Sequence, residues 1–207
     1  MADVYELYLV INSISFENFK AQNMVNIQES IKGLQSDNDK IRYKQFKILL
    51  PISEKNPESL YPHWDVLVDL LKKNEVSNKY YAICLIANVV KVDKQDKFEK
   101  IFNQFYNLLN HESPVVSPNI AGASGKIVNA KPHLESKITN KLLKVDSTSK
   151  SRYLDLMKSY VIQAFDGYFD KIKNKKKIIK FVENQLNSTS PKTRKLAKEF
   201  LKKRNIG

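Results

Sequence analysis

The chain has 207 residues, of which 42% are hydrophobic and 28% are charged, and it carries a formal net charge of +13. A chain of this length can bury a substantial core without disulfides or a structural metal. Its longest apolar stretch, residues 80–90, is about half as long as the roughly 20 residues that a membrane-spanning helix needs, so we expect no membrane insertion.

The positive charge is concentrated near the C-terminal end. Residues 1–170 contain 22 Lys or Arg against 20 Asp or Glu, whereas residues 171–207 contain 13 basic residues and only Glu183 and Glu199 as acids. A local excess of this kind attracts polyanions or acidic protein surfaces.

The first 24 residues are predicted to form an N-terminal cap. The alternation of Tyr5, Leu7 and Leu9 leaves both a helix and an extended segment open, and we favour a helix. Asp3 and Glu6 stand where a secretory signal carries basic residues, so we expect a cytoplasmic protein.

A helical pattern is clearest in residues 58–73. Leu60, Trp64, Leu67 and Leu71 recur there at steps of four, three and four, which places them on one apolar stripe. Residues 80–92 are apolar around most of the helix circumference, as in a helix that packs on several sides, and the two segments form a hairpin. Similar pairs are predicted at residues 25–34 with 40–52, 98–109 with 116–128, 134–143 with 152–168, and 172–186 with 193–203.

Capping residues punctuate these pairs. Ser113 and Ser190 each place a hydroxyl just before a proline, Pro114 and Pro191, and proline is tolerated in the first turn of a helix. We therefore expect each serine to cap the helix that follows it.

The helix pairs recur at nearly even intervals. Taking Arg42, Tyr81, Ser117, Arg152 and Arg194 as equivalent points gives spacings of 39, 36, 35 and 42 residues, within the range of stacked helical hairpins. The sequence thus predicts an all-α fold, an α-α superhelix of about five hairpins in a single domain over residues 1–207. Its parts are the cap (1–24), four repeats (25–57, 58–93, 94–132 and 133–170) and a basic C-terminal repeat (171–207).

A short motif in the last repeat points to a family. Residues 190–197 carry Pro191, then the β-branched Thr193, then Arg194 and the small Ala197, and this order resembles the second-helix signature of HEAT repeats. Residues 113–116 carry the first half of the signature. The resemblance covers about residues 26–204, and it implies a HEAT-like α-solenoid whose second helices line a concave face.

The glycine pair Gly122 and Gly125, followed by Lys126, invites comparison with a phosphate-binding loop. A P-loop has four residues between its glycines and Ser or Thr after its lysine, whereas here two residues intervene and Ile127 follows. The pair also misses the serine-elbow pattern, because Ser124 is followed directly by Gly125. We interpret these small residues as allowing close contact between helices.

No metal or catalytic constellation is evident. His63, His111 and His133 lack a second histidine or a cysteine at ligand spacing. Deoxyhypusine hydroxylases, a HEAT family, repeat a His-Glu pair for a di-iron site, but here the pair occurs once, at His111 and Glu112. We expect no catalytic residue, no metal and no cofactor.

A second comparison is with the alkylpurine DNA glycosylases, HEAT-like proteins that hold DNA on a basic concave face and use tryptophans and an aspartate at the lesion. The chain offers Trp64 and Asp65, but Trp64 is its only tryptophan and lies on the apolar stripe of its helix. Core packing is therefore the favoured interpretation of Trp64, and a glycosylase-like activity is the least favoured alternative.

The basic C-terminal repeat is a candidate polyanion-binding region, because two adjacent cationic helices would attract phosphates and release counterions. Arginine, the usual reader of guanine, occurs only four times in the chain, so such binding would be independent of nucleotide sequence. The alternative is a solvated face that caps the array. The candidate residues are Lys175, Lys176, Lys177, Lys192, Arg194, Lys195, Lys198 and Lys202.

Tyrosines and arginines near the starts of second helices are candidate partner-binding residues, since tyrosine is a rigid amphipathic anchor at interfaces. Packing between repeats is the alternative role. The candidates are Tyr43, Tyr81, Arg42 and Arg152. The sequence thus favours a non-enzymatic scaffold that binds a protein or peptide partner on its concave face, with nucleic-acid binding as the alternative.

Overall fold

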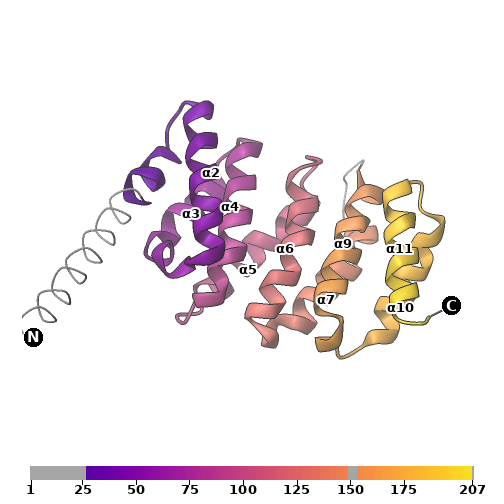
Figure 1. The fold of residues 1–207 in the computed structure, drawn as a ribbon. Coiled ribbons are helices and arrows are strands. Elements are labelled where there is room, and N and C mark those ends of the chain that lie inside the picture. Colours follow the sequence, from indigo (N-terminus) through magenta and orange to yellow (C-terminus); the bar gives the residue numbers. More distant parts are fainter. Residues whose placement is uncertain (1–26, 149–152, 207) are drawn as a thin grey trace, which may run out of the picture. The chain divides into compact units, whose positions relative to one another are not determined.

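The computed structural model describes residues 27–148 and 153–206, and these residues form α-helices and short 3-10 helices joined by turns (Figure 1). The described ranges contain no β-strand, so the prediction of an all-α fold is confirmed. The predicted N-terminal cap over residues 1–24 lies outside the described residues. Contacts divide the chain into two compact units, residues 1–63 and 64–207, and each is described by itself.

The first unit contains a helical segment at residues 27–33, then α2 (Asp39–Lys55), η1 (Pro57–Ser59) and η2 (Tyr61–His63). Asn38 caps α2, because its side-chain oxygen accepts hydrogen bonds from the backbone N–H groups of Lys40 (3.0 Å) and Ile41 (3.4 Å). The buried hydrophobic residues of this unit are Ile27, Ile31, Leu34, Phe46, Leu49 and Leu60.

The second unit is built from α-helices of 4 to 15 residues, several of which end in a single 3-10 turn. In chain order its helices are α3 (Trp64–Lys72), α4 (Val76–Val89), η3 (Val90–Val92), α5 (Lys97–Asn107), η4 (Leu108–Asn110), α6 (Val116–Ala130), η5 (Pro132–Leu134), α7 (Glu135–Leu143), α8 (Val145–Thr148), α9 (Leu154–Tyr168), η6 (Phe169–Lys171), α10 (Lys175–Asn184), η7 (Gln185–Asn187) and α11 (Pro191–Lys203).

Within the second unit, the second helix of each predicted pair packs on the next second helix along the chain. In this unit α4 contacts α6, α6 contacts α9, and α9 contacts α11, while α3 packs on α4 and α10 packs on α11. Figure 1 shows α4, α6, α9 and α11 following one another in chain order. A core of this kind buries each second helix on several sides, as predicted for residues 80–92.

Aromatic side chains of α5 are among the largest fully buried side chains of this core. Phe98 and Phe105 meet edge to face with ring centroids 5.3 Å apart, and both are fully buried. Tyr106 is 1% exposed, and its hydroxyl donates to Ser124 Oγ of α6 at 3.2 Å. Burial raises the pKa of Tyr106, with the hydrogen bond to Ser124 opposing, so the phenol stays protonated and ties α5 to α6.

The predicted helix boundaries are close to the observed ones, with two corrections. The single helix predicted over residues 58–73 is wrong at its start, because residues 57–63 form two 3-10 turns and α3 begins only at Trp64. Pro62 lacks the N–H that an α-helix would need there. The predicted cap at Ser113 is wrong, because its hydroxyl accepts from the N–H of Val115 (3.1 Å), which precedes the first residue of α6. Ser190 caps α11 through the N–H of Thr193 (3.3 Å), as predicted.

Gly125 lies where α6 meets α9. A Cβ atom built at Gly125 would be 3.4 Å from the backbone oxygen and 3.6 Å from the Cα of Ala164 in α9. Gly122, one turn earlier, has only Tyr160 Cδ1 nearby, at 3.5 Å. The interpretation of these glycines as small residues at a helix contact is therefore confirmed for Gly125.

Polar contacts join the first turn of α9 to the turn before α11. The Oδ2 atom of Asp155 accepts from the backbone N–H of Thr189 at 3.1 Å and from the Thr189 hydroxyl, and its Oδ1 atom lies 3.2 Å from Lys158 Nζ. The Thr189 hydroxyl lowers the pKa of Asp155, with partial burial opposing and Lys158 assisting. Because this pKa is lower in the folded state, ionised Asp155 stabilises the fold at neutral pH, and that contribution is lost as the pH falls through the folded pKa.

We expect Asp155→Asn to lower the free energy of unfolding by about 1 kcal/mol at neutral pH, a value reduced for partial solvent exposure. The difference from the wild type should begin to shrink below about pH 4, where the Asp155 carboxylate of the unfolded chain becomes protonated, and should disappear below the lower pKa of the folded state. Urea denaturation between pH 7 and pH 2 measures this, with Asp170→Asn as a control at an exposed carboxylate in η6. A deficit that stayed constant with pH would contradict a role for the ionised group.

Candidate interaction surface

Arg42 is engaged with its own turn. Its guanidinium donates from Nη1 to the backbone oxygens of Ser36 (2.8 Å) and Asp37 (3.0 Å), and Nη2 lies 3.0 Å from Asp39 Oδ1. The residue is 7% exposed. Its observed role is to hold the turn before α2, and little of the side chain is available to a partner.

The same contact recurs in the second unit. Arg194 Nη1 donates to the backbone oxygens of Ser188 (2.6 Å) and Thr189 (3.0 Å), again six and five residues earlier in the chain. Lys79 Nζ donates to the backbone oxygen of Lys73, also six residues earlier. We call this contact the turn clasp. It makes Lys79, and not Tyr81, the equivalent of Arg42 and Arg194.

The predicted partner-binding tyrosines differ in exposure. Tyr43 on α2 is 50% exposed, with Lys47 Nζ 4.8 Å from its ring centroid. Tyr81 is only 4% exposed and lies in the core, while the neighbouring Tyr80 is partly exposed. Adjacent positions on a helix point about 100° apart, which explains why only one of the two reaches the surface. Arg152 lies outside the described residues.

A row of side chains crosses the second helices of the second unit. Lys126 Nζ of α6 donates to Asn88 Oδ1 of α4 at 2.7 Å. Gly122, one turn before Lys126, leaves room for the Tyr160 ring of α9, and Lys192 Nζ of α11 lies 4.0 Å from the centroid of that ring. We call these five residues, Asn88, Gly122, Lys126, Tyr160 and Lys192, the second-helix strip.

A hollow with a volume of about 350 Å³ lies between α9 and α11, the two helices that carry the strip residues Tyr160 and Lys192. Apolar side chains of Ile162, Leu196 and Phe200 form part of its wall, and the remaining wall residues are Gln163, Asp166, Glu199 and Lys203. Lys203 and Arg204 both pair with Asp166, at 3.1 and 2.6 Å, which fixes one edge of the hollow. We call it the α9–α11 hollow.

The basic C-terminal repeat has two kinds of cation. Lys203 and Arg204 are paired with Asp166, and Arg194 clasps its turn. The exposed cations among the predicted candidates are Lys175, Lys176, Lys177, Lys192, Lys195, Lys198 and Lys202, and Lys171, Lys173 and Lys180 are exposed as well. Only Lys195 in that group has a recorded carboxylate neighbour, Glu199 at 3.9 Å, a separation and exposure at which an ion pair contributes little.

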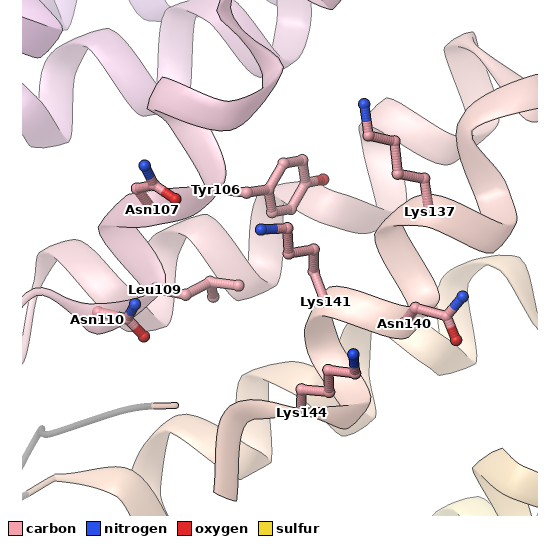
Figure 2. Close-up of a pocket in the computed structure, with 8 residues that line it drawn as sticks. All are labelled: Tyr106, Asn107, Leu109, Asn110, Lys137, Asn140, Lys141 and Lys144. Carbon is pink, nitrogen blue, oxygen red and sulfur yellow. The ribbon is translucent and has the colours of Figure 1, made fainter. Parts of the chain in front are cut away.

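A second hollow lies between the end of α5 and α7 (Figure 2), with a volume of about 410 Å³. Its lining residues are Tyr106, Asn107, Leu109, Asn110, Lys137, Asn140, Lys141 and Lys144. Figure 2 shows Lys141 reaching from α7 toward Tyr106 and Asn107 of α5. We call it the α5–α7 hollow. It was not predicted from the sequence, because its two walls, residues 106–110 and 137–144, are far apart in the chain.

The described residues hold no group of three or more His, Cys, Asp or Glu side chains that could bind a metal ion. Trp64 is 2% exposed, so its predicted place in the core is confirmed. His111 accepts from the backbone N–H of Ser113 (3.1 Å), and burial lowers its pKa. None of the helices in residues 27–148 and 153–206 combines the length and the apolar character required to cross a bilayer.

Comparisons with known proteins add little to this geometry. No protein-family model matches the chain, and a comparison with curated proteins found no match. Among solved structures, the crystal structure of an engineered protein is similar, with a TM-score of 0.49 and 17% sequence identity over 85% of this chain and 78% of that chain. No statement about the function of this chain follows from that similarity.

Proposed function

We propose that the chain is a HEAT-like α-solenoid that acts as a non-enzymatic scaffold and binds a protein partner along its second helices. The period supports this architecture: α2, α4, α6, α9 and α11 begin at residues 39, 76, 116, 154 and 191, at intervals of 37, 40, 38 and 37. The recurrence of the turn clasp at Arg42, Lys79 and Arg194 supports it independently.

The observation that carries the binding proposal is the α9–α11 hollow, whose two helices also carry residues of the second-helix strip. The hollow offers an apolar wall with charged residues at its edge, which suits the insertion of an apolar side chain from a protein. Tyr160 lies three residues before Gln163 on α9 and Lys192 lies four residues before Leu196 on α11, so the two helices that form the hollow also carry an aromatic ring and a cation in contact with each other. A partner segment with an apolar anchor flanked by acidic residues would satisfy both features.

A photocrosslinking experiment tests this proposal. We expect a photoreactive residue at position 163, in the wall of the hollow, to give a discrete protein adduct in native extract, and one at position 183, on α10, to give none. Leu196→Glu should remove the adduct at position 163, because a carboxylate would occupy the apolar wall. Leu196 is partly exposed, so the variant should still fold, which thermal denaturation checks.

An adduct that survives Leu196→Glu, or adducts of equal yield at positions 163 and 183, would contradict a partner site at the α9–α11 hollow. Turnover of a small substrate by the purified chain would contradict the non-enzymatic proposal.

A second candidate function is sequence-independent nucleic-acid binding through the basic C-terminal repeat. The exposure of Lys175, Lys176 and Lys177 on α10, together with the lysines of α11, favours it. Only Glu183 and Glu199 oppose these charges within the two helices. Its test is a salt titration of DNA and RNA affinity, described in the Discussion.

A further inference from the structure

We propose that the α5–α7 hollow binds a small molecule that carries a phosphate chain. This site is separate from the second-helix strip and from the lysines of α10 and α11, and the proposal does not depend on the function proposed above.

The wall of the hollow is made of cations and amides. Lys137, Lys141 and Lys144 supply ammonium groups, and the three asparagines of the lining, Asn107, Asn110 and Asn140, supply amide N–H donors. No carboxylate belongs to the lining. Such a wall favours an anion with several acceptor oxygens.

Lys137 and Lys141 lie on one side of α7, and Lys144 follows directly after its last residue. The three lysines recur at steps of four and three residues, and another side of the helix, with Ile138 and Leu142, is fully buried. From Lys137 to Lys144 the helix rises by about 10 Å, more than a single phosphate would need. A row of cations of this length therefore matches a chain of phosphates.

The position of Lys137 is supported by α5. Its Nζ atom lies 3.9 Å from the ring centroid of Phe102, a cation–π contact with the helical turn that precedes Tyr106. Lysines near the C-terminal end of a helix also interact favourably with the helix dipole, which explains in part why lysines occupy positions 141 and 144. That effect does not explain the asparagines Asn107 and Asn110, which line the same hollow from α5 and η4.

The remaining wall is apolar. The hydroxyl of Tyr106 donates to Ser124 at 3.2 Å and is therefore engaged within the protein. Tyr106 thus contributes its ring to the wall of the hollow, and Leu109 contributes an aliphatic side chain. A volume of about 410 Å³ lies in the range of small-molecule sites, which argues for a small ligand with a phosphate chain and a compact body.

Isothermal titration calorimetry at about 0.15 M salt, where diffuse attraction is screened over about 8 Å, tests the proposal with sodium tripolyphosphate, ATP and adenosine. We expect tripolyphosphate and ATP to bind and adenosine not to bind. Equal affinity for the first two would assign the phosphate chain as the recognised group, and tighter binding of ATP would add a contact between its nucleoside and the wall of Tyr106 and Leu109.

The matched variants are Lys137→Gln/Lys141→Gln/Lys144→Gln in the hollow and Lys175→Gln/Lys176→Gln/Lys177→Gln on α10, which remove the same charge. We expect the first to weaken ATP binding at least tenfold and the second to change it less than twofold. Asn140→Asp, which keeps all the lysines, should also weaken binding at least tenfold by adding a carboxylate to the wall.

Three results would overturn the proposal. Equal losses in the two triple variants would mean that the net charge alone attracts the anion. Adenosine binding as tight as that of ATP would mean that phosphate is not recognised. No heat with tripolyphosphate or ATP, from a protein whose circular dichroism shows it folded, would mean that the hollow has no such ligand.

Discussion

Gly125→Leu is expected to lower the free energy of unfolding of the second unit by about 3 kcal/mol, the upper part of the range for an overpacked core. A Cβ atom at this position would already be 3.4 Å from the backbone oxygen of Ala164, and that oxygen belongs to α9 and cannot rotate away. A leucine would have to separate α6 from α9, which are in extensive contact. Urea denaturation followed by tryptophan fluorescence measures the effect, because Trp64 is the only tryptophan and is 2% exposed.

The control is Gly122→Ala, in the same helix and one turn away. Its Cβ atom would meet only Tyr160 Cδ1 at 3.5 Å, an ordinary van der Waals distance. Alanine favours a helix over glycine by up to about 1 kcal/mol, so this variant should be as stable as the wild type or more stable. A cost below about 1 kcal/mol for Gly125→Leu would contradict the close approach of the two helices.

Reversing Lys192, Lys195, Lys198 and Lys202 to glutamate is expected to reduce the affinity for DNA and RNA at least about 100-fold at low salt, if the basic C-terminal repeat binds nucleic acid. All four side chains are exposed on α11. Contacts from four lysines to phosphates would give the wild type a slope of about −3 to −4 in a plot of log affinity against log salt. Fluorescence anisotropy with labelled oligonucleotides of unrelated sequence measures both quantities.

A charge-matched variant separates this patch from the field of the whole chain. Reversing Lys40, Lys44, Lys94 and Lys100, which are exposed elsewhere, lowers the net charge from +13 to +5, as the α11 variant does, because each reversal removes two positive charges. We expect this control to lose less than tenfold. Equal losses in the two variants, or an affinity that does not change with salt, would remove the nucleic-acid proposal.

The all-α fold and most helix positions could be predicted because their causes are local. The apolar stripe of Leu67 and Leu71 and the serine cap at Ser190 are visible within one turn of sequence. The 3-10 turns before Trp64 could also have been predicted, since Pro57 and Pro62 interrupt the helical hydrogen bonds there.

The surface residues were harder to predict because exposure depends on which neighbours pack where. Tyr80 and Tyr81 are equivalent in sequence chemistry, yet only Tyr81 is buried. Arg42 and Arg194 follow the HEAT-like pattern, and the structure shows that both guanidinium groups bind backbone oxygens of their own turns. The spacing of 38 residues between Gly122 and Tyr160 equals one repeat, and it is the feature of the sequence that indicates that these two residues of the strip lie on neighbouring second helices.

The turn clasp has a consequence for how such a chain can change its length. In each occurrence the cation and the oxygen it holds are six residues apart, so the shape of the bend is encoded inside a single helix pair. A whole repeat that is duplicated or deleted would therefore bring or remove both partners of its own turn clasp together. Variants with an added or deleted repeat of about 38 residues should therefore keep the turns between their helices. A variant whose boundary falls between Lys73 and Lys79 would instead separate the Lys79 ammonium group from the backbone oxygen to which it donates.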